Sequence, residues 1–132
     1  MDTPRQTSAG DLRAAVSNGI VAAIKRLYGK GPERARTYFA DEYVFCVMEG
    51  GLTPSEQTLV DAGEDHLVRQ YRLRFQEVVR DDLVSIVEGV TGRTVTGYHS
   101  QIVFKPTRLF EVFALDAPAA PATPAPGDPR AR

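Results

Sequence analysis

Few side chains in this sequence have the type and spacing that covalent or acid–base chemistry requires. His66 and His99 are the only histidines and Cys46 is the only cysteine, so a structural zinc site of the usual kind lacks ligands. Cys46 lies within an apolar run, which predicts a buried thiol and not a nucleophile. No convergent set of nucleophile, base and oxyanion donors is evident. We therefore expect no catalytic residue, no metal and no cofactor, and we do not expect an enzyme.

Two arginines are candidates for recognition. Arg69 and Arg72 are three residues apart in a segment with helical periodicity, which predicts that they share a face. Such a pair could grip an anionic ligand or an acidic partner surface. Exposed arginines more often belong to a solvated face, with ion pairs to neighbouring carboxylates such as Asp65 or Glu77. The sequence leaves both interpretations open.

A glycine-rich turn, Gly29-Lys30-Gly31-Pro32, is a second candidate element. It resembles part of a phosphate-binding loop, but it follows a predicted helix and precedes a predicted strand. A phosphate loop needs the reverse order, so that the N–H groups of a helix N-terminus face the anion. We interpret the segment as the end of a helix, with Gly29, Gly31 and Pro32 as candidate partner contacts.

The strongest local signal in the chain is Thr53-Pro54-Ser55-Glu56. The Thr53 side chain can accept from the third helical N–H, the proline has no N–H to leave unsatisfied, and Glu56 can reach back to Thr53. The pattern predicts a short helix from here to about residue 62. Leu52, Thr53 and Glu56 complete the candidate binding surface.

These residues must be positioned by helices and strands that periodicity places in separate blocks. Apolar residues recur at helical spacing over 11–27 and again over 64–90. The first helix should begin near Ser8 or Asp11, where Ser8-Ala9-Gly10-Asp11 can cap exposed backbone N–H groups. We expect the second stretch to form one long helix, and the pattern leaves open whether Asp81-Asp82 interrupts it. Aromatic and β-branched residues predict strands over 34–40, 43–49, 93–100 and 109–115, with Asp41-Glu42 as a tight hairpin turn.

The expected fold class is α+β, with the order α-β-β-α-β-β. It is a two-layer sandwich that places the long helix and an N-terminal helix on one face of a four-stranded, mainly antiparallel sheet. The second strand is apolar on both faces. Its alternating residues are Tyr43, Phe45 and Val47 on one side and Val44, Cys46 and Met48 on the other. A chain of 132 residues has few helices for a second cover, so we expect a homodimer in which another copy supplies it.

Composition excludes several functional classes. Sixteen basic and seventeen acidic residues leave a net charge of -1, so no overall field attracts nucleic acid, and no nucleic-acid partner is expected. No stretch approaches the roughly 20 apolar residues of a membrane span, and the first ten residues are polar, so neither direct membrane insertion nor secretion is expected. We expect a cytoplasmic protein with disordered residues 1–10, a domain over 11–115 and a disordered Ala/Pro-rich tail over 116–132.

Several segments, in this order, carry a family resemblance. They are the turn 28–33, the hairpin through Asp41, the loop and helix start 50–59, Leu67-Val68-Arg69, Arg72, Glu88, Thr91-Gly92-Arg93 and the closing strand 111–115. Together they resemble the MpsC family, labelled "Na+-translocating membrane potential-generating system". The likeness covers about residues 10–115 and excludes the Ala/Pro-rich tail.

The resemblance implies a small soluble protein, encoded in some genomes near membrane systems for cation-coupled inorganic carbon uptake, with no established catalytic residues. Our hypothesis is an accessory or regulatory protein that binds a partner in such a membrane system. The alternative is a ligand-binding domain that senses an anion or a nucleotide through the same arginines. Both use one set of candidate residues: Gly29, Gly31, Pro32, Leu52, Thr53, Glu56, Arg69 and Arg72.

Overall fold

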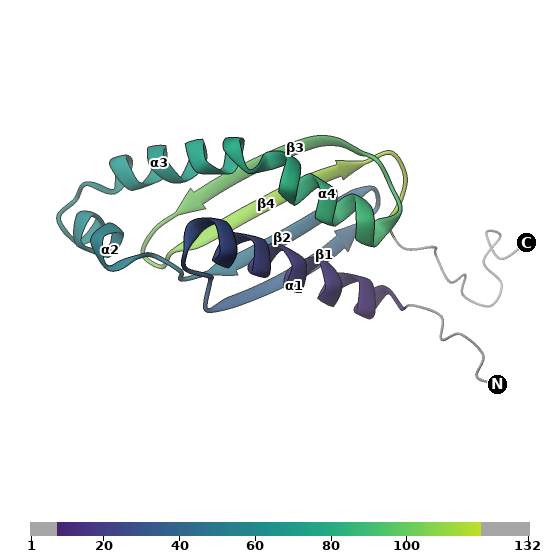
Figure 1. The fold of residues 1–132 in the computed structure, drawn as a ribbon, viewed down its shortest axis with the longest axis horizontal. Helices are drawn as coiled ribbons and strands as arrows, with labels where there is room; N and C mark the ends of the chain where they lie inside the picture. Colours follow the sequence, from purple (N-terminus) through teal and green to yellow (C-terminus); the bar gives the residue numbers. More distant parts are fainter. Residues whose placement is uncertain (1–7, 120–132) are drawn as a thin grey trace, which may run out of the picture.

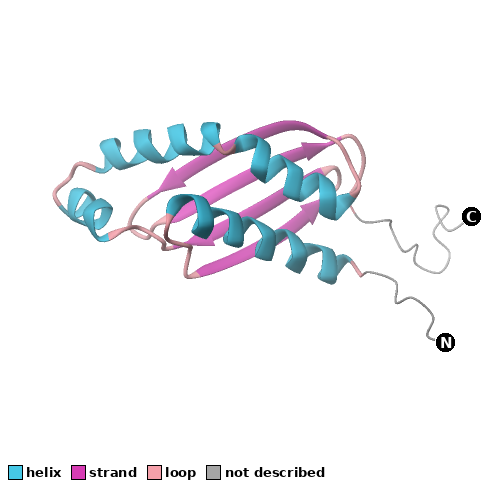
Figure 2. Ribbon diagram, viewed as in Figure 1, coloured by secondary structure: helices cyan, strands magenta, loops and turns pink. Residues whose placement is uncertain are grey.

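The computed structural model describes residues 8–119, which form two layers (Figure 1). The elements in chain order are α1 (Ala9–Tyr28), β1 (Arg34–Ala40), β2 (Tyr43–Glu49), α2 (Pro54–Asp61), α3 (Asp65–Val78), α4 (Arg80–Thr91), β3 (Val95–Val103) and β4 (Arg108–Leu115). Helices α1, α3 and α4 lie on one face of the sheet, and α2 lies at one end of the helical layer (Figure 2). The predicted α+β class and the two-layer arrangement are confirmed. The disorder predicted for the two ends falls largely on residues 1–7 and 120–132, outside the described range.

The sheet is antiparallel throughout its four described strands, with the order β1-β2-β4-β3. The first hairpin turns at Asp41-Glu42, where Asp41 has a φ of 52°. Aspartate tolerates this left-handed conformation because its short polar side chain can bond locally. The two central strands, β2 and β4, place Cys46 opposite Glu111 and Phe45 opposite Val112. The predicted hairpin is confirmed. The register of β2 and β4 determines which residues lie on each face of the sheet.

Helix α1 has the ends that the sequence predicts. Ser8 accepts from the N–H of Asp11 and the Asp11 side chain accepts from the N–H of Ser8, which forms a capping box. The helix ends at Gly29, whose φ of 93° suits glycine and whose N–H donates to the Lys25 carbonyl. The buried stripe of the helix comprises Val16, Ile20, Ala23 and Ile24.

The single long helix predicted over 64–90 is not confirmed. The segment forms α3 and α4, which meet at Val79 (φ −95°, ψ 6°), two residues before the Asp81-Asp82 pair. Hydrogen bonds continue through the bend, because the N–H of Val79 donates to Phe75 and the N–H of Leu83 donates to Val79. Val79 itself is buried in the core. A sheet twists along its strands, so a bent pair of helices can keep both apolar stripes on it where a straight rod would lift off.

Strand β3 also differs from its predicted bounds, 93–100, because it begins at Val95 and continues to Val103. Arg93 and Thr94 belong to the turn, where the N–H of Thr94 donates to the Asp116 side chain at 3.2 Å. Beyond β4, Ala119 is buried and the Pro118 carbonyl accepts from Arg93. The described part of the predicted tail thus packs against the domain.

The two faces of the sheet differ in cover. The face beneath the helices, here called the covered face, holds fully buried residues of the central strands: Val44, Cys46, Met48 and Phe113. The opposite face, here called the open face, carries Tyr38, Tyr43, Phe45, Val47, Phe110 and Val112. Tyr38 and Tyr43 are 47% and 41% exposed, and the other four are half-buried. The helices of the described chain leave the open face bare.

Candidate functional site

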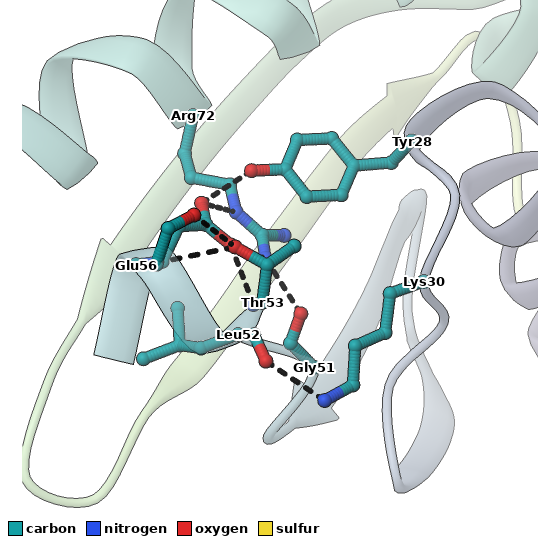
Figure 3. Close-up of polar contacts among 8 residues, drawn as sticks. Tyr28, Lys30, Gly51, Leu52, Thr53, Glu56 and Arg72 are labelled. Carbon is teal, nitrogen blue, oxygen red and sulfur yellow. Dashed lines mark hydrogen bonds and ion pairs between the residues drawn. The ribbon is translucent and has the colours of Figure 1, made fainter. Parts of the chain in front are cut away.

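Four of the predicted candidate residues, Leu52, Thr53, Glu56 and Arg72, gather where two loops meet the start of α2 (Figure 3). The loop after α1 lies against the loop after β2, since the N–H of Glu33 donates to Glu49 at 2.9 Å and Lys30 Nζ donates to the Leu52 carbonyl at 2.8 Å. The approach is close at Gly51, which has a φ of 85°. A Cβ at this position would stand 3.1 Å from Pro32 Cα. Glycine is required here for both its conformation and its size.

A buried ion pair joins these loops to α3. Arg72 Nε donates to Glu56 Oε2 at 2.8 Å, and Arg72 Nη2 donates to Glu56 Oε1 at 2.9 Å. The same Nη2 donates to the Gly51 carbonyl at 2.7 Å. Arg72 is only 3% exposed and Glu56 only 6%. The two-point geometry is the strong form of an arginine–carboxylate contact, and it fastens α2 to α3 and to the loop after β2.

Tyr28, at the end of α1, closes the same cluster from the other side. Its hydroxyl donates to Glu56 Oε2, and the Arg72 guanidinium stacks 3.9 Å from the centre of its ring. The ring also meets Phe75 edge-on, with centroids 4.8 Å apart. Tyr28 therefore links α1 to α2 through a hydrogen bond, and to α3 through a cation–π contact and an aromatic contact.

Glu56 takes part in the capping box that the sequence predicts. Its N–H donates to the Thr53 hydroxyl at 3.3 Å, and its carboxylate accepts from the N–H of Thr53 at 2.8 Å. Sequence reasoning assigned Glu56 to this cap but did not pair it with Arg72 or Tyr28. The 16-residue separation of Glu56 and Arg72 is not a local pattern. Only the tertiary fold brings them together.

Burial and pairing act in opposite directions on the protonation of Glu56. Burial alone would raise its pKa, but the bonds from Arg72, the Thr53 N–H and Tyr28 outweigh burial and lower the pKa to about 2. Burial raises the pKa of Tyr28 well above its ordinary value, and the bond to Glu56 adds to the rise. Glu56 and Arg72 therefore remain a charged pair at neutral pH, and each neutralises the other.

The structure separates the two arginines that were predicted to share a face. Arg72 points into the cluster, whereas Arg69 is 38% exposed, lies 3.7 Å from Asp65 and sits over the Phe104 ring. A step of three residues rotates a helix by about 300°, enough to move one side chain inside while the other stays at the rim. Arg69 thus has the ion pair named in the solvated interpretation. Arg72 is not available at the surface.

A second polar cluster lies under the helices and was not foreseen. Glu111, on the covered face, is fully buried and accepts from the hydroxyls of Tyr98 and Ser100. Burial raises its pKa to about 7, and the two hydroxyl donors only partly offset the rise. Gln76 lies beside Tyr98, and its buried Nε2 has no hydrogen-bond acceptor among residues 8–119. The alternation of the strand predicts that Glu111 faces inward, but no spacing pattern predicts its partners.

The described part of the chain has no cluster of potential metal ligands. No group of three or more His, Cys, Asp or Glu side chains within residues 8–119 has the proximity to hold a metal ion. Cys46 is buried as predicted, and burial raises the pKa of its thiol to about 11. Its thiol is therefore protonated at neutral pH.

Comparison with known proteins identifies a family. The family model described as "Na+-translocating membrane potential-generating system (MpsC)" matches residues 8–117, nearly the whole of the described domain. No curated protein and no solved structure matches the chain. In the described residues, none of the helices has both the length and the apolar character to cross a membrane.

Proposed function

The chain belongs to the MpsC family, which is described as a Na+-translocating membrane potential-generating system. We propose that the protein is an accessory component of such a system, and that it forms a homodimer that binds protein partners. The observation that carries the proposal is the open face of the sheet. Apolar side chains line that face on both central strands, and the helical layer lies entirely on the other side. An uncovered apolar face of this kind marks an interaction surface.

The register shows how continuous the open face is. Tyr38, Phe45 and Val112 are direct neighbours across β1, β2 and β4. Val47 and Phe110 form the next pair along the same strands. Aromatic and β-branched side chains side by side form a flat apolar surface that interdigitates well with another sheet.

A second copy of the chain is the occupant that the charges favour. On the two central strands the open face carries no charged side chain from Tyr43 to Val47 or from Phe110 to Ala114, and Arg36, opposite Val47, lies on the edge strand β1. A second copy would therefore meet an uncharged strip. Charges lie at one end of the face, where Arg34 and Arg108 each lie 3.9 Å from Glu49. An apolar centre with a polar rim is the usual anatomy of a protein interface. Symmetric pairs are the commonest assemblies of soluble proteins.

The arginines give less support to an anion sensor. Arg72 is buried and its charge is neutralised by Glu56, while Arg69 is already paired with Asp65. The cysteine supports placement in the cytoplasm, because a lone buried thiol fits a reducing compartment. We therefore rank protein binding above ligand sensing.

The proposal is tested by measuring mass in solution for two matched substitutions. Val47→Asp puts a charge at the centre of the open face, whereas Val78→Asp puts the same charge on α3, where Val78 is 75% exposed. Light scattering after size exclusion should give a two-chain mass for the wild type and Val78→Asp, and a one-chain mass for Val47→Asp. Circular dichroism should be unchanged in all three. A two-chain mass for Val47→Asp would refute the interface.

A further inference from the structure

Exposed apolar side chains also gather on the helical side of the molecule, around a groove between α2 and α3. The groove has a volume of about 420 Å³ and is lined by residues that include Leu59, Leu67 and Tyr71. These three side chains are 37%, 45% and 60% exposed. Leu67 and Tyr71 are four residues apart on α3, so they point the same way, and Leu59 faces them from α2. We call this site the α2–α3 groove.

The groove is held open by the buried cluster. Tyr28 and Glu56 line it, and Glu56 is fixed by Arg72 through two hydrogen bonds. Tyr71 lies against Tyr28, with ring centroids 6.0 Å apart. A site formed by side chains with fixed positions loses little conformational entropy when a ligand binds. The ion pair thus serves as a positioning element for the groove.

The turn between α2 and α3, here called the rim of the groove, is acidic, although its carboxylates do not line the groove itself. Residues 53–68 include four carboxylates and no lysine or arginine. Arg72 neutralises Glu56, which leaves Asp61, Glu64 and Asp65 around the turn between the two helices. Of these, Asp65 is paired loosely with Arg69 and Glu64 lies near His66. The excess of negative charge favours a cationic partner.

The walls indicate the conformation of that partner. Helices satisfy their own backbone N–H and C=O groups, so α2 and α3 offer no free strand edge to an extended peptide. Recognition here depends on side chains, which is how an amphipathic helix docks in an apolar groove. We propose that the α2–α3 groove binds an amphipathic helix of a protein partner, with leucine-like side chains in the groove and lysines or arginines facing the acidic rim. This inference rests on the proposed partner-binding function and assigns the partner a surface separate from the open face.

The test uses three labelled peptides of equal length as probes. The first is an amphipathic helix of leucine and lysine, the second has glutamate in place of lysine, and the third keeps the lysines but has serine in place of leucine. Fluorescence anisotropy should show saturable binding of the leucine–lysine helix. Binding of the other two should be at least about 10-fold weaker, equivalent to about 1.4 kcal/mol.

Variants of the chain locate the binding site. Leu67→Ser and Tyr71→Ser should each weaken binding of the leucine–lysine helix by about 10-fold, since each removes an apolar contact. Val78→Ser is the control, because Val78 is more exposed than either but does not line the groove. The double substitution Asp61→Asn and Glu64→Gln should reduce the difference in affinity between the leucine–lysine helix and the glutamate helix. Equal binding of the lysine and glutamate helices, or no effect of Leu67→Ser and Tyr71→Ser, would overturn the proposal.

Mass and spectra separate this inference from the dimer. Leu67→Ser and Tyr71→Ser should retain a two-chain mass, because neither residue lies on the open face. Amide chemical shifts of the wild type titrated with the leucine–lysine helix should move in α2 and α3. Shifts confined to β2 and β4 would place the peptide on the open face and overturn the α2–α3 groove. A one-chain mass for the wild type with intact peptide binding would refute the dimer alone.

Discussion

The two faces of the sheet have similar apolar residues but very different surroundings. In β2, Val44, Cys46 and Met48 on the covered face are at most 1% exposed, whereas Tyr43 on the open face is 41% exposed. The alternation of one strand supplies both sets, so the difference comes from the helices and not from the strand. Burial of the covered face stabilises the folded monomer. The open face has more apolar surface than the monomer fold requires, and we attribute the excess to association.

A large loss of stability is expected at Arg72, which links the helices of the helical layer. Arg72→Met would leave Glu56 buried without a cation and should cost about 3–5 kcal/mol in the free energy of unfolding. Arg69→Met is the matched control, and because Arg69 is partly exposed it should cost at most about 1 kcal/mol. Urea denaturation measures both. Equal costs would mean that the buried pair does not fasten the helical layer.

A pair of phenylalanines on β4 compares the two faces directly. Phe113→Ala empties a fully buried site on the covered face and should cost about 3–5 kcal/mol. Phe110→Ala on the open face should cost about 1–2 kcal/mol at a concentration where the chains are separate. At high concentration the cost of Phe110→Ala should rise, because the dimer then buries that side chain. A concentration-independent cost would contradict cover by a second copy.

The buried carboxylate of the covered face should leave a signature in the pH dependence of stability. The pKa of Glu111 is raised from 4.5 to about 7 in the folded chain, so its favourable contribution is complete below the unfolded value and is lost as the pH rises through the folded value. Stability should fall by about 3 kcal/mol between these two pH values. Glu111→Gln should remove this fall, and Glu49→Gln, which loses a half-exposed carboxylate, should retain it.

Glu56 should affect the pH dependence of stability in the opposite direction. Its pKa is lowered to about 2, so its contribution is present above 4.5 and is lost only as the pH falls towards 2. Unfolding midpoints measured across the acid range should therefore rise and then fall as the pH is lowered from 7. A monotonic profile would contradict the opposite environments of Glu56 and Glu111.

The reactivity of a single cysteine compares the two faces of the sheet with the smallest change to the protein. Cys46 should react with a thiol reagent far more slowly in the folded chain than in urea, because it is buried and its pKa is about 11. In a Cys46→Ala background, Val47→Cys moves the thiol by one residue to the open face. This thiol should react readily in dilute protein and become protected as concentration rises. Protection at every concentration would indicate cover from within one chain.

The sequence predicted the features that depend on neighbouring residues. Capping at Ser8 and Thr53, the glycine end of α1 and the turn at Asp41 are all set by side chains within a few positions of one another. Family membership also followed from ordered local segments. The sequence also predicted that both faces of β2 are apolar, because the side chains of a single strand alternate between the two faces.

What the sequence could not predict depends on long-range geometry. Helical periodicity continues across the break between α3 and α4 at Val79, so the pattern does not encode the break. Arg72 was grouped with Arg69 by spacing, whereas its burial depends on Glu56 and Tyr28, each from a different helix. The cluster around Glu111 similarly requires the pairing of β3 with β4. Residues far apart in the chain become partners only after the layers have assembled.

Sedimentation equilibrium of the unmodified protein tests the central claim most directly. Runs from nanomolar to tens of micromolar concentrations should show a mass that rises from 14.5 kDa, the mass of one chain, to twice that value and then stays constant. A mass of one chain throughout this range would contradict the homodimer, and with it the role assigned to the open face.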